Sequence, residues 1–181
     1  MTASLRSATP SVPLEPPPPQ PDVRLSRMHV ARTSVGALAA LLVVRLVGLP
    51  EPYWAAITTL VVMQSSLAAS WTVSWKRMVG TAIGAIVGGT LATFFPSSDY
   101  LFAVALLVTG LLCVSAGLDR VAYRFTGITL AIITLVARSR PGWIIASHRF
   151  AEVSIGIAIG LLVTAVWPEK AEGGPVVPAS P

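Results

Sequence analysis

Six charged or strongly polar side chains lie inside or beside long apolar stretches of this sequence, and their chemistry suits the binding of a small anion. They are Arg45, Gln64, Arg77, Arg124, Arg149 and Glu152. An ionisable side chain within hydrocarbon is costly, so it is expected to face protein or a water-filled path. Guanidinium and amide groups donate hydrogen bonds to carboxylates, and a buried carboxyl group can carry a proton. We therefore expect these side chains to line a pathway for a small anion.

Each charged candidate also has a structural interpretation. Arg45 lies about one turn from the end of its apolar stretch, where its side chain can reach the membrane interface. Arg77 can act as an interface anchor, and Arg124 can extend to the interface or line an inner vestibule. Glu152 follows Arg149 by three residues, so the two can pair on one helix face. Alternatively, Glu152 binds a proton and so couples movement of the anion to a proton gradient.

The uncharged polar residues are less specific. Thr58, Thr59, Thr126 and Thr129 lie in two apolar stretches, and such hydroxyls often bond to their own helix backbone. Gln64 is harder to satisfy locally, so its side chain is expected to face protein or water. Its amide donors would suit a carboxylate.

The sequence gives little support for an enzyme. Cys113 is the single cysteine, so no disulfide can form within the chain. His29 and His148 are far apart and have no neighbouring cluster of metal-ligating residues, so no metal site is expected. Nucleophile, phosphate-loop and paired-carboxylate motifs are absent from the sequence. No cofactor is expected.

Composition and hydropathy indicate the elements that must position the candidates. Apolar residues make up 54% and charged residues 12% of the chain, against about 25% charged in soluble domains. The mean hydropathy is +0.73, and the apolar stretches reach transmembrane length. We predict an all-α, polytopic membrane protein with six transmembrane helices. Their ranges are 30–49, 53–69, 77–95, 100–118, 121–137 and 150–167.

Polar segments rich in proline flank this predicted membrane domain, which covers residues 28–168. Residues 1–27 are expected to form a disordered cytoplasmic tail. This tail is not expected to be a signal peptide, because no apolar stretch follows its first charges. Residues 169–181 are expected to form a second disordered tail.

Two segments of the predicted membrane domain resemble each other. RMVGTAIGAIVG (77–88) and RFAEVSIGIAIG (149–160) both begin with an arginine, and each places glycines seven and eleven positions after it. Three spans fit between the two starting points, so a tandem repeat would cross the membrane in the opposite sense, as in many transporters. The glycines predict close helix packing, either within one subunit or across a dimer interface. The packing candidates are Gly80, Gly84, Gly88, Gly156 and Gly160.

The basic residues predict an orientation with both termini in the cytoplasm. With that orientation, nine lysines and arginines lie on the inner side and four on the outer side. Three of the outer four, Arg138, Arg140 and Arg149, flank the start of the sixth predicted span, as an inverted repeat would require. The pI near 10.1 does not indicate nucleic-acid binding, because the basic residues lie at the ends of apolar spans.

The segment from residue 53 to 89 resembles the signature region of the fusaric-acid-resistance-like, or aromatic acid exporter, membrane domain. That family shows a Tyr-Trp pair at the start of a span, a polar span end, and then Arg-x-x-Gly-Thr-x-x-Gly. The matching residues are Tyr53, Trp54, Gln64, Ser65, Arg77, Gly80, Thr81 and Gly84. The last predicted span also resembles the closing helix of the family. The resemblance covers residues 30–168.

The resemblance implies a transporter of the inner (cell) membrane that exports aromatic carboxylates or related organic anions. Plant malate channels are distant relatives of this family and have six spans that work as dimers, so a homodimer is expected here. The chain is expected to differ from the large exporters, because we predict one membrane module and no soluble domain in it. Two alternatives therefore stay open: a passive organic-anion channel, and a non-transporting membrane subunit that needs a partner.

Overall fold

The computed structural model of the protein describes residues 27–136 and 140–168. These residues form six α-helices and no strand, which confirms the predicted all-α class. The helices are α1 (Arg27–Val47), α2 (Tyr53–Val62), α3 (Leu67–Phe94), α4 (Asp99–Ser115), α5 (Arg120–Leu135) and α6 (Gly142–Val166). Arg27, placed in the predicted N-terminal tail, is the first residue of α1; the rest of the two predicted tails and Arg138 lie outside the described residues.

Three of the helices, α1, α3 and α6, are long and apolar enough to cross a membrane. Two others, α2 and α4, are apolar but shorter. The protein is therefore a helical membrane protein with several candidate spans. By length and composition, the described residues provide fewer candidate spans than the six predicted.

The second predicted span, residues 53–69, consists of two elements. α2 ends before Met63, whose backbone is extended. The hydroxyl of Ser66 then accepts a hydrogen bond from the backbone N–H of Ala69 at 3.2 Å, and serine is a favoured residue at the start of a helix. Gln64 therefore lies in a link between two helices, and the prediction that it lies inside a span was wrong.

Both long central helices begin earlier than predicted. α3 starts ten positions before Arg77, and α6 starts seven positions before Arg149, directly after Pro141. A charged pair such as Lys76–Arg77 indicates a membrane interface, but arginine and lysine are good helix formers and do not end a helix. Arg77 and Arg149 consequently lie in helix interiors, where neighbouring helices can surround their side chains.

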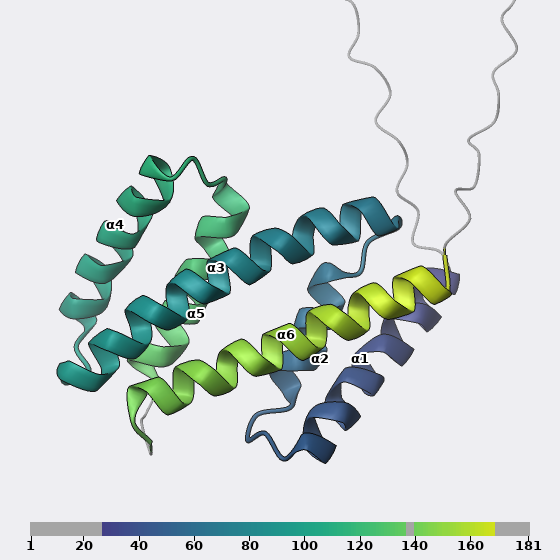
Figure 1. The fold of residues 1–181 in the computed structure, drawn as a ribbon, viewed down its shortest axis with the longest axis horizontal. Coiled ribbons are helices and arrows are strands. Elements are labelled where there is room, and N and C mark those ends of the chain that lie inside the picture. The colour runs from purple at the N-terminus through teal and green to yellow at the C-terminus, as the bar shows by residue number, and fades with distance from the viewer. Residues whose placement is uncertain (1–26, 137–139, 169–181) are drawn as a thin grey trace, which may run out of the picture.

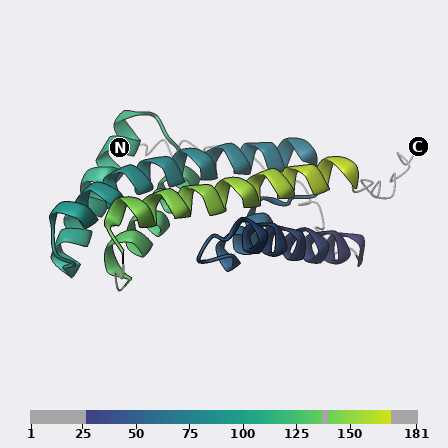
Figure 2. The same ribbon diagram turned by 60° about the horizontal axis from the view of Figure 1, so that its bottom comes forward.

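α3 and α6 run antiparallel and form the centre of the fold (Figures 1 and 2). At one end of this pair, Gly89 packs against Ala146. Further along, the Ser154 hydroxyl donates to the Met78 sulfur at 3.7 Å. In Figure 1, α4 and α5 lie along one part of this pair, and α1 and α2 lie along the other. The central pair thus connects two peripheral helix hairpins.

The glycines of the central helices allow close approach of the short helices. A Cβ atom on Gly84 would lie 2.6 Å from the carbonyl oxygen of Thr126 in α5. A Cβ atom on Gly156 would lie 2.5 Å from the carbonyl oxygen of Ala55 in α2. Side chains at these positions would collide with backbone, so the glycines pack within the chain: α3 against α5, and α6 against α2.

Candidate functional site: two buried arginines

Arg77 connects three helices through its guanidinium group. Its side chain starts from α3, and the residue is 5% exposed. The Nε and Nη2 atoms donate to the hydroxyl oxygen of Thr58 in α2 at 3.2 and 2.9 Å. The guanidinium also lies 4.7 Å from the ring centroid of Phe125 in α5. Arg77 is therefore held by a neutral hydroxyl and an aromatic ring.

No carboxylate among the described residues forms an ion pair with Arg77. Ser74, three residues earlier on the same helix face, is buried, and its hydroxyl has no hydrogen-bond partner in this part of the chain. A buried cation without a counter-ion is costly. The combination of a positive charge without a counter-ion and an unused hydroxyl is chemically suited to an anion.

Arg149 has a different set of partners. Like Arg77, Arg149 is 5% exposed. Nη2 forms an ion pair with Glu51 from the link between α1 and α2, and Nη1 donates to Glu152 at 3.3 Å. The guanidinium lies 4.4 Å from the ring centroid of Trp54. One buried cation thus has two carboxylate neighbours, which come from two different elements.

A pocket of about 210 Å³ lies beside this cluster. Arg149 and both carboxylates, Glu51 and Glu152, line it together with Arg140 and His148. This volume is below the roughly 300–1,000 Å³ of pockets for drug-sized ligands. The pocket therefore suits a small molecule, and its polar groups can bind both anionic and hydrogen-bond-donating parts of such a molecule.

The surroundings of the two arginines correspond at a nearly constant interval along the chain. We define the repeat offset as the interval in sequence from Arg77 to Arg149. The aromatic residues beneath the two guanidinium groups, Trp54 and Phe125, are separated by one position less than this offset. Each half of the chain therefore supplies one arginine and one aromatic ring at matching positions.

The glycine contacts follow the same offset. Gly156 faces Ala55 and Thr58, whereas Gly84 faces Thr126 and Thr129. Thr126 follows Ala55, and Thr129 follows Thr58, by the same interval that separates Phe125 from Trp54. The contacts of α3 with α5 thus repeat those of α6 with α2.

Both arginines also contact the same short helix, one turn apart. Arg77 donates to Thr58, and Arg149 lies over the ring of Trp54, which is four positions earlier in α2. Residues at this spacing lie on one face of a helix. The two guanidinium groups therefore contact α2 at points about one helical turn apart.

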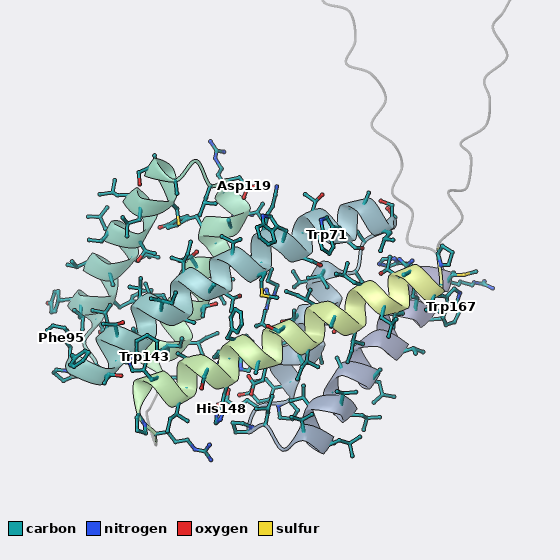
Figure 3. The ribbon with its side chains drawn as sticks, viewed as in Figure 1. Trp71, Phe95, Asp119, Trp143, His148 and Trp167 are labelled. Carbon is teal, nitrogen blue, oxygen red and sulfur yellow. The ribbon has the colours of Figure 1, made fainter. Side chains whose placement is uncertain are left out.

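The segments beside the two arginines lie on opposite sides of the molecule. Lys76, the residue next to Arg77, forms an ion pair with Asp119 in the link between α4 and α5. Arg149 pairs with Glu51 in the link between α1 and α2. Figure 3 shows Asp119 and His148, the neighbour of Arg149, on opposite sides. Each arginine is thus associated with a different link.

The remaining predicted pathway residues are not brought to either arginine. Arg45 is exposed in the last turn of α1, and Arg124 is exposed on α5. The Gln64 amide donates to the carbonyl oxygen of Val61 at 3.1 Å, so it is satisfied locally. This local bond uses one of the two N–H donors of the amide.

Sequence reasoning missed Arg32, which is fully buried in α1. Its Nη2 donates to the backbone carbonyl of Gln64 at 2.7 Å, and its Nη1 donates to the carbonyl of Trp167 at 3.2 Å. Arg32 thus ties the start of α1 to the link before α3 and to the end of α6. Glu51 was also missed, because its proline neighbours, Pro50 and Pro52, indicated only a turn.

Comparison with known proteins gives one family match and several relatives. Residues 24–163 match the family described as fusaric acid resistance protein-like. The inner membrane protein YeeA of Escherichia coli is 30% identical over 149 residues, covering 80% of this chain and 42% of YeeA. The inner membrane protein YccS of the same species is 27% identical over 142 residues, covering 78% of this chain and 20% of YccS.

A third relative from Escherichia coli, the uncharacterized transporter YdhK, is 28% identical over 153 residues, covering 80% of this chain and 23% of YdhK. The chain thus spans between about one fifth and two fifths of the length of these relatives. No solved structure matches the chain significantly.

Proposed function

The chain belongs to the fusaric acid resistance protein-like family, and from this premise we propose that it is a transport module that exports aromatic carboxylates or related organic anions. Two similar proteins are named as inner membrane proteins and one as a transporter. These names support an inner-membrane location and a role in transport. The substrate class and the direction of transport are parts of the proposal.

The observation that carries the proposal is the environment of Arg77. This arginine is buried and forms no ion pair with a carboxylate of the described residues. A substrate carboxylate would supply the missing negative charge, and a guanidinium binds a carboxylate through two parallel hydrogen bonds. The ring of Phe125, whose centroid lies 4.7 Å from the Arg77 guanidinium, places an aromatic group beside this charge, where it could contact the ring of an aromatic acid.

Within this proposal the six helices together form the membrane domain, as two inverted repeats of three helices. The nearly constant repeat offset between the contacts in the two halves supports the repeat. The antiparallel directions of α3 and α6 support the inversion. The hydrogen bond from Arg32 to Trp167 keeps the start of α1 and the end of α6 on one side, which fits two cytoplasmic termini.

Glu152 is the proposed coupling residue. It is 1% exposed, and it accepts hydrogen bonds from Arg149 at 3.3 Å and from the backbone N–H of Glu51 at 3.1 Å. Ionisable residues inside membrane helices often form proton relays. Protonation would remove the charge that Glu152 presents to Arg149, so it would change how strongly α6 is held to the link between α1 and α2.

The closed packing around Arg77 favours a transporter with alternating access over an open channel. A channel requires a continuous wet path, whereas Arg77 is almost completely covered by α2 and α5. An anion could reach it only when these contacts open. We propose a homodimer as the working unit. Formation of this dimer would not change the contacts described within one chain.

The test is the transport of labelled 4-hydroxybenzoate by the purified protein in liposomes, with and without an imposed proton gradient. Flux that depends on the gradient is expected. Flux that ignores the gradient and carries large currents would favour the passive channel instead. Absence of flux for a series of aromatic acids, in a protein shown to be folded, would contradict autonomous transport.

A further inference from the structure

The Arg149 cluster contains more negative charge than its arginine requires. Arg149 supplies one positive charge, and its ion-pair partners Glu51 and Glu152 supply two carboxyl groups. Glu152 is 1% exposed and lies on the same helix, so it remains beside Arg149 when other elements move. Glu51 belongs to a different element, and its side chain is 36% exposed. Of the two, Glu51 is the carboxylate that can leave.

The guanidinium of Arg149 is incompletely used. Nη1 donates to Glu152, and Nη2 interacts with one oxygen of Glu51. The Nε atom is buried and has no hydrogen-bond partner among the described residues. Nε and Nη2 form one edge of the planar guanidinium, and this edge matches the two oxygens of a carboxylate. Glu51 therefore fills only half of an edge that can hold a whole carboxylate.

The space for such a ligand is adjacent. The pocket of about 210 Å³ is lined by Arg149, Glu51 and Glu152. Arg140 and His148 on its wall add donors that can partly offset the two acids. A small carboxylate that enters this pocket would lie beside Arg149 and Glu51, which both line it.

Comparison with Arg77 isolates the role of the two acids. Gly80 precedes Glu152 by the repeat offset, so it is the counterpart of Glu152 in the other half of the chain. Ala122 follows Glu51 by one position less than this offset, so it is the counterpart of Glu51. Arg77 therefore has no acidic residue at either corresponding position. Arg149 thus forms ion pairs with two carboxylates of the chain, whereas Arg77 forms none with the described residues.

We propose that Glu51 is an internal occupant of the anion-binding edge of Arg149, which a substrate carboxylate displaces. The inference rests on the proposed function, because it assumes that the module binds organic anions. Glu51 then acts as a specificity-determining residue: a ligand needs an anionic group, such as a carboxylate, to take over its bond to Arg149. The indole N–H of Trp54, which donates to Glu51 at 3.1 Å, holds Glu51 in place and is released when it leaves.

Binding of 4-fluorobenzoate to the purified full chain in detergent, measured by fluorine NMR, tests this inference. Glu51→Gln removes the competing charge and keeps the size of the side chain. We expect it to lower the Kd for 4-fluorobenzoate about tenfold, whereas Glu51→Asp should change it less than about twofold. The affinity for the neutral analogue 4-fluorobenzamide should not increase in Glu51→Gln, because this analogue does not carry the negative charge that Arg149 binds.

Asp99→Asn is the matched control, because it removes one carboxylate from an exposed position of α4 outside the pocket. It should leave the Kd unchanged. Trp54→Phe is the second variant in case Glu51→Gln does not fold. It keeps a ring over Arg149 but loses the N–H that holds Glu51, so it should also tighten the binding of 4-fluorobenzoate.

An unchanged or weaker affinity in folded Glu51→Gln would overturn the inference, as would an equal gain for the amide or for Asp99→Asn. The proposed function would survive that result if Arg77→Gln still abolished the flux of aromatic acids. If neither the native protein nor any variant bound or transported aromatic carboxylates, both proposals would fall together.

Discussion

Arg77 in α3 and Arg149 in α6 begin two similar sequence segments, and each guanidinium lies over an aromatic ring, at 4.7 and 4.4 Å. The correspondence stops at their ionic partners. Arg149 pairs with two carboxylates, whereas Arg77 forms no ion pair with an acid of the described residues. This difference within one repeated arrangement is the basis of the proposed anion site at Arg77.

Glu152→Gln should uncouple transport from the proton gradient. The amide keeps the size of the side chain but cannot take up a proton, and Arg149 retains Glu51 as an ionic partner. We expect gradient-driven accumulation of 4-hydroxybenzoate in liposomes to fall to the level without a gradient, while exchange of internal for external substrate continues. Gradient dependence that persists in this variant would remove Glu152 from the coupling mechanism.

Gly84→Ala and Gly156→Ala should destabilise the protein to a similar extent. The new methyl groups would lie 2.6 and 2.5 Å from backbone carbonyl oxygens of α5 and α2, and such overpacking costs about 1–3 kcal/mol. Thermal unfolding in detergent measures the effect. Gly127→Ala is the control, because its methyl would meet only the end of the Leu106 side chain at 3.1 Å. Equal melting temperatures for all three variants would contradict the packing described here.

Arg32→Gln should weaken the fold near the start of α1. The substitution removes charged hydrogen bonds to the carbonyl groups of Gln64 and Trp167, and bonds of this kind contribute about 1.5–3 kcal/mol each. A lower unfolding temperature and faster proteolysis at the link between α2 and α3 are expected. Arg27→Gln removes the same charge from an exposed position of the same helix and should have little effect.

The link between α4 and α5 should become less stable in acid. The hydrogen bond from Lys76 lowers the pKa of Asp119 below its ordinary value of 3.8. A carboxyl group with a lowered pKa stabilises the fold at higher pH, and that contribution is lost as pH falls through the folded-state pKa. Asp119→Ala should therefore lower the unfolding temperature between about pH 5 and 8, and the difference from the native protein should shrink as pH falls below 3.8. A difference that stays constant in acid would contradict the ion pair.

Several features of the fold follow from local sequence signals. The spacing of Gly84 and Gly156 after the two arginines indicated close helix packing, and the structure shows the backbone contacts involved. The three-residue spacing of Arg149 and Glu152 indicated an ion pair, which is present at 3.3 Å. These features depend on residues within one helix, where spacing alone determines which side chains share a face.

Other features depend on contacts between distant segments and could not be derived from spacing. Glu51 meets Arg149 from a separate link far earlier in the chain, and Arg77 meets Thr58 in another helix. The break between α2 and α3 was predictable in principle, because Ser66, which precedes α3, is a favoured residue at the start of a helix. Hydropathy concealed it, since apolar residues continue on both sides of the link.

The most direct test of the account compares Arg77→Gln with Arg45→Gln in liposomes that report the flux of labelled 4-hydroxybenzoate. Both variants lose one arginine, but Arg45 is exposed whereas Arg77 is 5% exposed. We expect Arg77→Gln to insert and fold but to lose at least about tenfold in flux, equivalent to about 1.4 kcal/mol. Arg45→Gln should transport like the native protein. Undiminished flux in folded Arg77→Gln would contradict the claim that this arginine binds the transported anion.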